Sequence, residues 1–194
     1  YGKLTNFNST FETVGKAAAY IWKSTNPLMV ETKPEPEEVT LLDEGLDKGI
    51  GTMDTINIVG EQTWKYIGGK NKCVQMNGSN TPNEDWLITP ELDLTGMSEA
   101  TLTFKSKFTT AVPEEFQKQY TVLVSSTGDI AKAEDWNELP VIPYDSTTFT
   151  TATVSLPAEM IGKKCYIAWK YQCDTVSHTW QLRNIVVKAM TKVD

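Results

Sequence analysis

From Val39 onward the chain consists of short runs in which apolar and polar residues alternate, and turn-forming residues separate these runs. In the run 101–105, Leu102 and Phe104 face one side, while the intervening Thr and Lys residues face the other. A period of two is typical of an antiparallel sheet with one buried and one solvated face. Many short strands joined by Gly-rich and Asn-Gly turns predict a β-sandwich or a barrel.

The same criteria give the other candidate strands, which are 39–42, 55–59, 63–67, 72–76, 86–89, 120–125, 149–156, 164–172 and 179–188. Trp86 opens a short strand that Pro90 stops, and its indole is expected to anchor the core because it buries a large area. The run 120–125 is apolar on both faces, which predicts a strand inside a sheet. The alternation of the last run slips at Arg183–Asn184, which predicts a β-bulge.

The residues before Val39 follow a different pattern. Ser9 and Glu12 fit a capping box, and the apolar residues after them fall near one helical face, which predicts a helix; a strand through 19–23 is the alternative. The run 33–38 alternates Pro with charged residues and predicts an extended, solvated linker. We therefore predict an N-terminal extension and linker over 1–38, a candidate tail of a preceding domain, and a β-domain over 39–194.

The net charge, the hydropathy and the cysteines indicate which partners and which disulfides are not expected. The 194 residues carry a formal net charge of −7, so the chain is not expected to bind nucleic acid or anionic membranes, which require a basic face. No apolar run approaches the ~20 residues of a membrane helix, so direct membrane insertion is not expected. Cys73, Cys165 and Cys173 are odd in number and poorly spaced for pairing, which predicts three buried free thiols.

The order of the motifs resembles the choice-of-anchor J domain, which is related to the cleaved-adhesin modules of gingipains. The resemblance covers roughly 41–189 and rests on Leu42–Leu46, Gly60–Trp64, Asn83–Pro90, Leu92–Leu94, Ala100–Phe104, Tyr120–Ser125, Trp136 with Glu138–Pro140, Gly162–Tyr171 and Thr179–Ile185. It implies an all-β fold, a two-sheet antiparallel jelly-roll β-sandwich of the kind found in galactose-binding and carbohydrate-binding modules. It also implies a non-enzymatic surface protein of Gram-negative anaerobes, often a lipoprotein.

We therefore expect a non-catalytic, adhesin-like module, secreted or on the outer cell surface and lipid-anchored in the full-length protein, that recognises a glycan or an extracellular protein. A purely structural spacer is the alternative, and a glycan hydrolase is a distant third. His178, the only histidine, lies in a loop, and no nucleophile-elbow motif is present. The paired acids 37–38, 84–85 and 114–115 are expected to be solvated charges, because neighbours in a strand point to opposite faces.

Aromatic residues give the candidate ligand site. Sugar rings stack on exposed Trp or Tyr faces, and function concentrates on loops. Trp86, Trp169 and Trp180 lie inside strand motifs and are expected in the core. The candidate ligand-binding residues lie nearer strand ends and loops; they are Trp64, Tyr66, Trp136 and Tyr144. As a hypothesis, Trp136 and Tyr144 flank one shallow groove.

A calcium site is the candidate metal centre. The loop after the first strand offers carboxylate oxygens from Asp43, Glu44 and Asp47, and calcium prefers such ligands. If the first and last strands pair, Asn184 approaches Glu44, which gives Asp43, Glu44 and Asn184 as candidate ligands. Arg183 stands where calcium-binding members of the resembled family tend to place an Asp. The alternative is therefore an ion pair between Arg183 and Glu44 or Asp43.

Overall fold

The computed structural model describes residues 34–140 and 142–193, and Pro36–Asp194 form one compact unit. The predicted helix after Ser9, its strand alternative at 19–23 and the region before the linker lie outside the described residues. The division at residue 38 therefore stays a prediction. The first strand of the compact unit, β1, begins at Glu38. No described helix has the length and apolarity that a membrane crossing would need.

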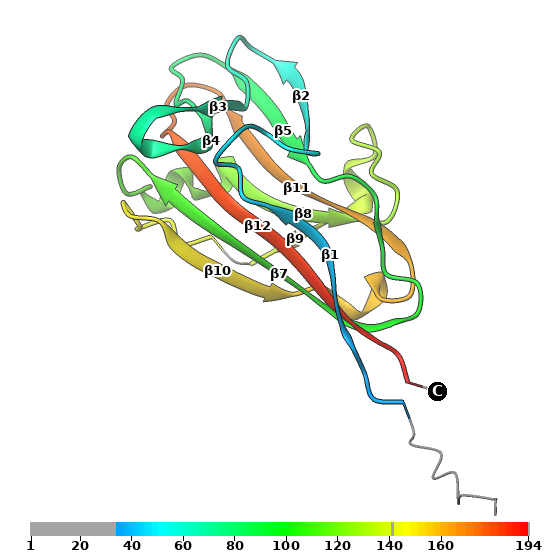
Figure 1. Cartoon of the computed structure of the whole chain (residues 1–194). Coiled ribbons are helices and arrows are strands. Elements are labelled where there is room, and N and C mark those ends of the chain that lie inside the picture. The colour runs from blue at the N-terminus through cyan, green and yellow to red at the C-terminus, as the bar shows by residue number, and fades with distance from the viewer. Residues whose placement is uncertain (1–33, 141, 194) are drawn as a thin grey trace, which may run out of the picture. The chain divides into compact units, whose positions relative to one another are not determined.

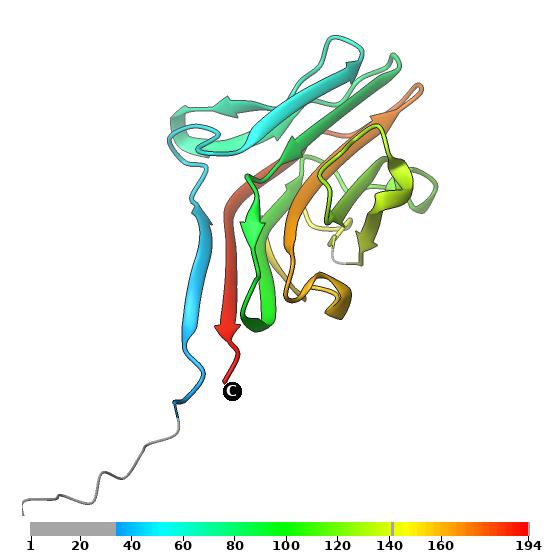
Figure 2. The same cartoon turned by 90° about the vertical axis from the view of Figure 1, so that its right-hand side faces the viewer.

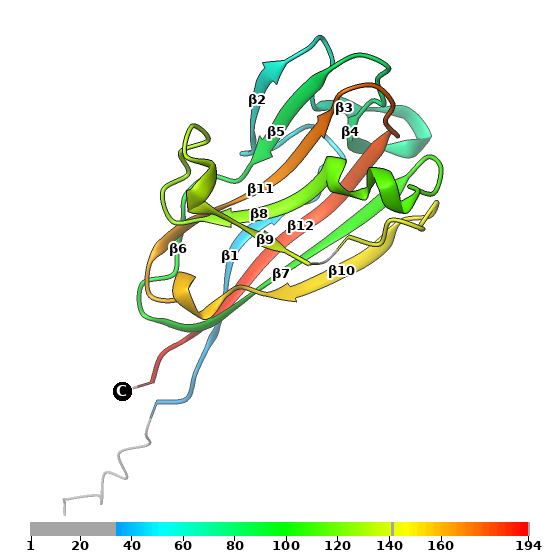
Figure 3. The same cartoon turned by 180° about the vertical axis from the view of Figure 1, so that it is seen from behind.

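Two six-stranded antiparallel sheets lie face to face, as the edge-on view in Figure 2 shows. Sheet A, in front in Figure 1, has the order β10 (Thr150–Ser155), β7 (Met97–Phe108), β12 (Trp180–Thr191), β4 (Cys73–Met76) and β3 (Lys65–Ile67), with β1 (Glu38–Glu44) also paired to β12. Sheet B, in front in Figure 3, has the order β2 (Asp54–Val59), β5 (Asn83–Ile88), β11 (Lys164–Cys173), β8 (Tyr120–Ser125) and β9 (Trp136–Leu139), with β6 (Leu92–Asp93) beside β11. Four short 3₁₀ turns complete the described elements: η2 (Gly69–Asn71), η3 (Glu114–Gln119), η4 (Ala133–Asp135) and η5 (Ala158–Met160). The all-β two-sheet sandwich predicted from the sequence is confirmed.

The core between the sheets is aromatic, as predicted for Trp169 and Trp180, which are both fully buried. Phe104 meets Trp169 edge-on at 5.4 Å, and Phe108 stacks on Trp180 at 5.8 Å. Such pairs stabilise the core beyond the area they bury. The three cysteines are free and buried, which confirms the prediction of unpaired thiols.

The predicted bulge in the last strand is present. The pairing of β12 with β7 shifts register between Arg183 and Val186, and Asn184 has a φ of 50°. Asn tolerates this left-handed conformation better than most residues. The Asn184 amide donates to the carbonyl of Gly45 at 3.1 Å, so the bulge fastens the loop after β1.

Four features depart from the predicted elements. β7 is longer than the predicted run at both ends, and β9 was not predicted as a strand. β5 begins at Asn83, so Asp85 lies inside a strand and is fully buried; its expected role as a solvated charge is wrong. Trp86 is buried, as predicted, but it lies on the outer face of sheet B, not between the sheets.

Candidate functional site

Three of the four residues predicted to bind a ligand make contacts inside the protein instead. Trp64 is only 3 % exposed and its ring lies 5.3 Å from Trp180, so its expected loop exposure is wrong. The half-buried Tyr66 donates its hydroxyl to the Asp47 carbonyl at 2.8 Å. Tyr144 is also half-buried and donates to the Tyr120 carbonyl at 2.9 Å. Both tyrosines fix neighbouring loops through their hydroxyl groups, and their rings are packed at the rim of the sandwich.

Trp136 and Tyr144 do not share a groove. Tyr144 lines a depression of about 450 Å³ with Pro140, Pro143 and Thr151. Trp136 lines a different depression, of about 220 Å³, on the outer face of sheet B. The hypothesis that the two residues flank one groove is therefore wrong, because the Trp136 ring packs against Trp86 on the outer face of sheet B, whereas the Tyr144 ring packs against Phe108.

The outer face of sheet B carries an indole pair that joins strands far apart in the sheet. The Trp86 and Trp136 rings meet edge-on at 5.2 Å. Between β5 and β9 lie Ala168 of β11 and Leu123 of β8, which are paired in register. The small Ala168 side chain leaves room for the two rings to close over it. This produces a second, smaller apolar layer outside the sandwich.

Hydrogen bonds and a cation hold both indoles in place. The Trp86 Nε1–H donates to Glu84 Oε1 at 3.0 Å, and the Trp136 Nε1–H donates to the Asp129 carbonyl at 3.0 Å. The Lys170 Nζ lies 5.1 Å from the Trp86 ring centroid and 3.3 Å from Glu84 Oε1. A cation over an indole is favourable by roughly 0.5–2 kcal/mol, depending on desolvation. The aromatic wall is therefore fixed before any ligand arrives.

The depression beside this wall is amphipathic. Thr121 and Leu123 of β8 line it together with Lys118 and Gln119 from the end of η3, and Lys170 and Gln172 from β11 complete the polar side. At about 220 Å³ it is smaller than the ~300–1,000 Å³ of sites for drug-sized ligands. It therefore suits one ring of a longer ligand. Apolar C–H groups can contact the indole edges, while hydroxyls reach amide and ammonium donors.

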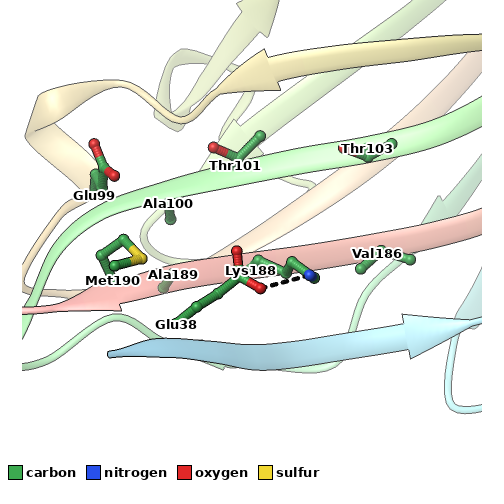
Figure 4. Close-up of a pocket in the computed structure, with 9 residues that line it drawn as sticks. All are labelled: Glu38, Glu99, Ala100, Thr101, Thr103, Val186, Lys188, Ala189 and Met190. Carbon is green, nitrogen blue, oxygen red and sulfur yellow. Dashed lines mark hydrogen bonds and ion pairs between the residues drawn. The ribbon is translucent and has the colours of Figure 1, made fainter. Parts of the chain in front are cut away.

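The outer face of sheet A holds a second depression, of about 410 Å³. Figure 4 shows its side chains rising from three strands: Glu38 from β1; Val186, Lys188 and Met190 from β12; and Thr101 and Thr103 from β7. The Lys188 Nζ donates to Glu38 Oε1 at 2.6 Å. The depression contains hydroxyls and short apolar patches, but no aromatic ring lines it.

Two carboxylates, Glu38 and Glu99, line the sheet A depression, and paired acids are what a glycan hydrolase uses. Both are exposed, and Glu38 is engaged by Lys188. A hydrolase needs one carboxyl group in an environment that keeps it protonated while the other stays ionised. Solvation and the ion pair give the two groups no such contrast in surroundings.

The predicted calcium ligands are only partly brought together. β1 and β12 pair as expected, with Glu44 opposite Ile185, so Asn184 lies near Glu44. The Glu44 Oε1 atom, however, accepts hydrogen bonds from the Thr52 amide at 2.8 Å and its hydroxyl at 2.6 Å. Asp43 precedes Glu44 in the strand and is exposed. Within residues 34–140 and 142–193, no three His, Cys, Asp or Glu side chains cluster closely enough to hold a metal ion.

Positively charged side chains surround Asn184, the third predicted calcium ligand. Asn184 and Asp47 share a depression of about 480 Å³ with Lys70, Lys72 and Arg183. Three positive side chains against one carboxylate disfavour a hard dication. The predicted ion pair of Arg183 with Glu44 or Asp43 is wrong, because the guanidinium lies over the Phe149 ring at 4.0 Å. A calcium site at Asp43, Glu44 and Asn184 stays a prediction.

Sequence reasoning missed the environment of Asp85. Its Oδ2 accepts a hydrogen bond from Asn83 Nδ2 at 2.6 Å and a longer one from Asn57 Nδ2 at 3.4 Å, while its buried Oδ1 has no partner among residues 34–140 and 142–193. Burial raises the pKa of Asp85 to about 7, although both amides act to lower it. The alternation of Asn83, Asp85 and Leu87 was the available signal, since it places all three on the face toward the core.

Solved structures with the same fold include two cleaved adhesin domains of Lys-gingipain from Porphyromonas gingivalis W83. The K1 domain is 24 % identical with a TM-score of 0.55, covering 80 % of this chain and 99 % of that domain. The K3 domain is 22 % identical with a TM-score of 0.54, covering 78 % and 99 %. TmCBM61, solved with β-1,4-galactotriose, is 9 % identical with a TM-score of 0.52, covering 77 % and 97 %. No family model and no curated protein matches the sequence. These likenesses show the fold, a two-sheet antiparallel β-sandwich.

Proposed function

We propose that the chain is a non-catalytic binding module that recognises a glycan in the depression on the outer face of sheet B. The observation that carries this proposal is the fixed Trp86–Trp136 pair beside a polar wall. Saccharides present apolar ring faces and polar rims, and the depression offers both kinds of partner. Lys118, Lys170 and Gln172 would donate hydrogen bonds to hydroxyl oxygens. One small subsite predicts weak, multivalent recognition, as suits adhesion.

The fold comparisons support a binding role without fixing the ligand. TmCBM61 was solved with a galactose oligomer, and the two gingipain domains are cleaved adhesin domains. Location outside the cell, with a lipid anchor in the full-length protein, belongs to the same proposal and rests on the sequence resemblance. An extracellular protein carrying glycans would use the same site.

The test combines a glycan array with amide chemical-shift mapping. A bound oligosaccharide is expected to shift the amides of β8 and β11 near Thr121 and Lys170. Thr121→Gln fills the floor of the depression and is expected to abolish binding. Thr153→Gln, an equal change on the outer face of sheet A, is the matched control and should bind normally. Glycan binding that survives Thr121→Gln, or shifts confined to other strands, would overturn the proposed site.

A structural spacer is the second candidate, and one observation favours it. All tryptophans among the described residues are buried, with Trp136 the most exposed at 8 %. Sugar-binding modules usually present a more open aromatic plane. An array without any bound glycan, together with shifts absent at millimolar oligosaccharide, would favour the spacer and exclude the binding module.

A further inference from the structure

Strand register gathers cations on the outer face of sheet A, at the end near β3. Val74 and Met76 of β4 point into the core, so Gln75 between them points outward. Lys65 lies opposite Gln75, and Gln75 lies opposite Gln181. Gln181 lies opposite Lys107 of β7. Residues paired in register share a face of the sheet. Lys65 and Lys107 therefore lie at the two ends of one row of outward-facing residues that crosses four strands.

A second outward row runs beside the first. Arg183 lies opposite Lys105, and Lys105 lies opposite Thr151 of β10. Lys70 and Lys72 reach the same end of the sheet and share a depression with Arg183. We call this set the cationic face; its members are Lys65, Lys70, Lys72, Lys105, Lys107 and Arg183. It spans three inter-strand steps, about 14 Å at ~4.8 Å each.

This cluster of positive charges is unusual because the chain as a whole is acidic. The sequence has 25 acids against 18 bases, and Arg183 is its only arginine. None of the ion pairs between described residues includes a member of the cationic face. Unpaired like charges repel one another, so their concentration at one end of a sheet costs stability. An anionic partner would offset that cost.

Arg183 is held in place and has an unused donor. Its guanidinium carbon lies 4.0 Å from the Phe149 ring centroid, and the Lys107 Nζ lies 5.8 Å from the same centroid. The Arg183 Nε is buried without a hydrogen-bond partner among the described residues. Burial raises the pKa of the neighbouring Cys73 thiol, and the charges of Arg183 and Lys107 act to lower it. The two cations, Arg183 and Lys107, therefore both lie near the buried Cys73 side chain.

From these contacts we infer that the cationic face binds an acidic polysaccharide, a chain carrying sulfate or carboxylate groups. Arg and Lys donate charge-assisted hydrogen bonds to such groups. Beside Lys105 on β7, the Thr103 hydroxyl can meet a sugar hydroxyl. Beyond it, the Glu38 and Glu99 carboxylates of the depression in Figure 4 would repel an acidic chain, so the face ends there. This ligand uses the opposite sheet from the depression proposed above, so the two proposals stand or fall separately.

Acidic polysaccharide fits this face better than nucleic acid. Single strands bind through successive aromatic platforms on which bases stack. The cationic face has one aromatic ring, Phe149, and Arg183 and Lys107 already cover it.

The experiment measures binding of fluorescent dextran sulfate and neutral dextran by anisotropy at low and at physiological ionic strength. The protein is expected to bind dextran sulfate and not dextran, with affinity falling as salt screens the charges. The double variant Lys65→Gln with Lys105→Gln should weaken binding about tenfold, since two charge-assisted contacts are lost. Both residues are exposed, so the variant is expected to fold normally. Circular dichroism checks this.

The matched control is Lys163→Gln with Lys192→Gln, which removes the same charge from exposed positions away from the cationic face and from the depression on sheet B. It should bind dextran sulfate like the unmodified protein. Equal weakening by both double variants would show a net-charge effect and overturn the proposal. Absence of binding at low salt would do the same. Single-stranded DNA bound more tightly than dextran sulfate would assign the face to nucleic acid instead.

Discussion

Asp85 should make the stability of this protein fall as pH rises through neutrality. The carboxyl group is fully buried; one oxygen accepts hydrogen bonds from Asn83 and Asn57, and the other has no partner in the described part of the chain. Desolvation raises its pKa from 3.8 to about 7. A raised folded-state pKa means that the folded protein holds a proton that the unfolded chain has released. Between these two values, folding is therefore favoured by acid and weakened by base.

The magnitude follows from the two pKa values. At pH 5 the folded carboxyl is protonated and the unfolded one is mostly ionised; at pH 8 both are ionised. Proton linkage then lowers the free energy of unfolding by about 2–3 kcal/mol between pH 5 and pH 8. The full shift of about three units would correspond to about 4 kcal/mol. This is a large fraction of the 5–15 kcal/mol that stabilises a typical domain.

Urea unfolding at a series of pH values between 5 and 8 measures the effect. Asp85→Asn keeps the shape and removes the titration, so its unfolding free energy should lose this pH dependence, whatever its absolute value. Asp54→Asn, at an exposed carboxylate on neighbouring β2, should follow the profile of the unmodified protein. If the Asp85→Asn profile runs parallel to that of the unmodified protein, Asp85 does not titrate in this window and the reasoning fails.

Three further outcomes test the packing and the loops. Trp86→Ala is expected to cost about 3–5 kcal/mol in urea unfolding, as large-to-small changes at buried sites do; a loss under about 1 kcal/mol would contradict its burial. Gly51→Ala should destabilise strongly, because Gly51 has a φ of 61° and a Cβ there would lie 1.8 Å from Glu44 Oε2. Adding Glu44→Ala should recover part of that loss, and no recovery would contradict the clash. Millimolar calcium should leave the melting temperature unchanged, because cations surround Asn184; a clear rise would support the predicted metal site.

The fold was predictable because its signals are local. Strict alternation placed Leu102 and Phe104 in the core, and the phase slip at Arg183–Asn184 marked a real bulge. β9 was missed because its four residues carry apolar side chains only at the two ends, Trp136 and Leu139. A strand this short has too few positions to show a period, and its pairing with β8 is set by tertiary contacts.

The candidate sites were less predictable because they depend on which strands lie side by side. Nothing in the sequence brings Trp86 and Trp136 together, since their contact requires β11 and β8 to lie between them with a small Ala168 beneath. Loop position suggested that Trp64 would be exposed, but the neighbouring Trp180 draws it into the core. Whether an aromatic ring near a strand end is buried depends on the residues that pack against it in the fold, and a single sequence does not show which residues these are.

Net charge alone does not report where charges cluster, and this bears on the proposal for the cationic face. A value of −7 correctly describes the molecule at a distance, where a polyanion would be repelled. Close to the surface the local arrangement decides, because salt screens charges that lie beyond a Debye length, which is about 8 Å at physiological ionic strength. Sheet register places Lys105, Lys107 and Arg183 on two neighbouring strands, and Lys65 lies at the far end of a row that spans about 14 Å at ~4.8 Å per step. An acidic ligand should therefore bind slowly at low salt, because the whole molecule repels it, yet remain bound through local contacts. Moderate salt would then raise the association rate while it also raises the dissociation rate, a combination that a uniformly basic surface cannot give.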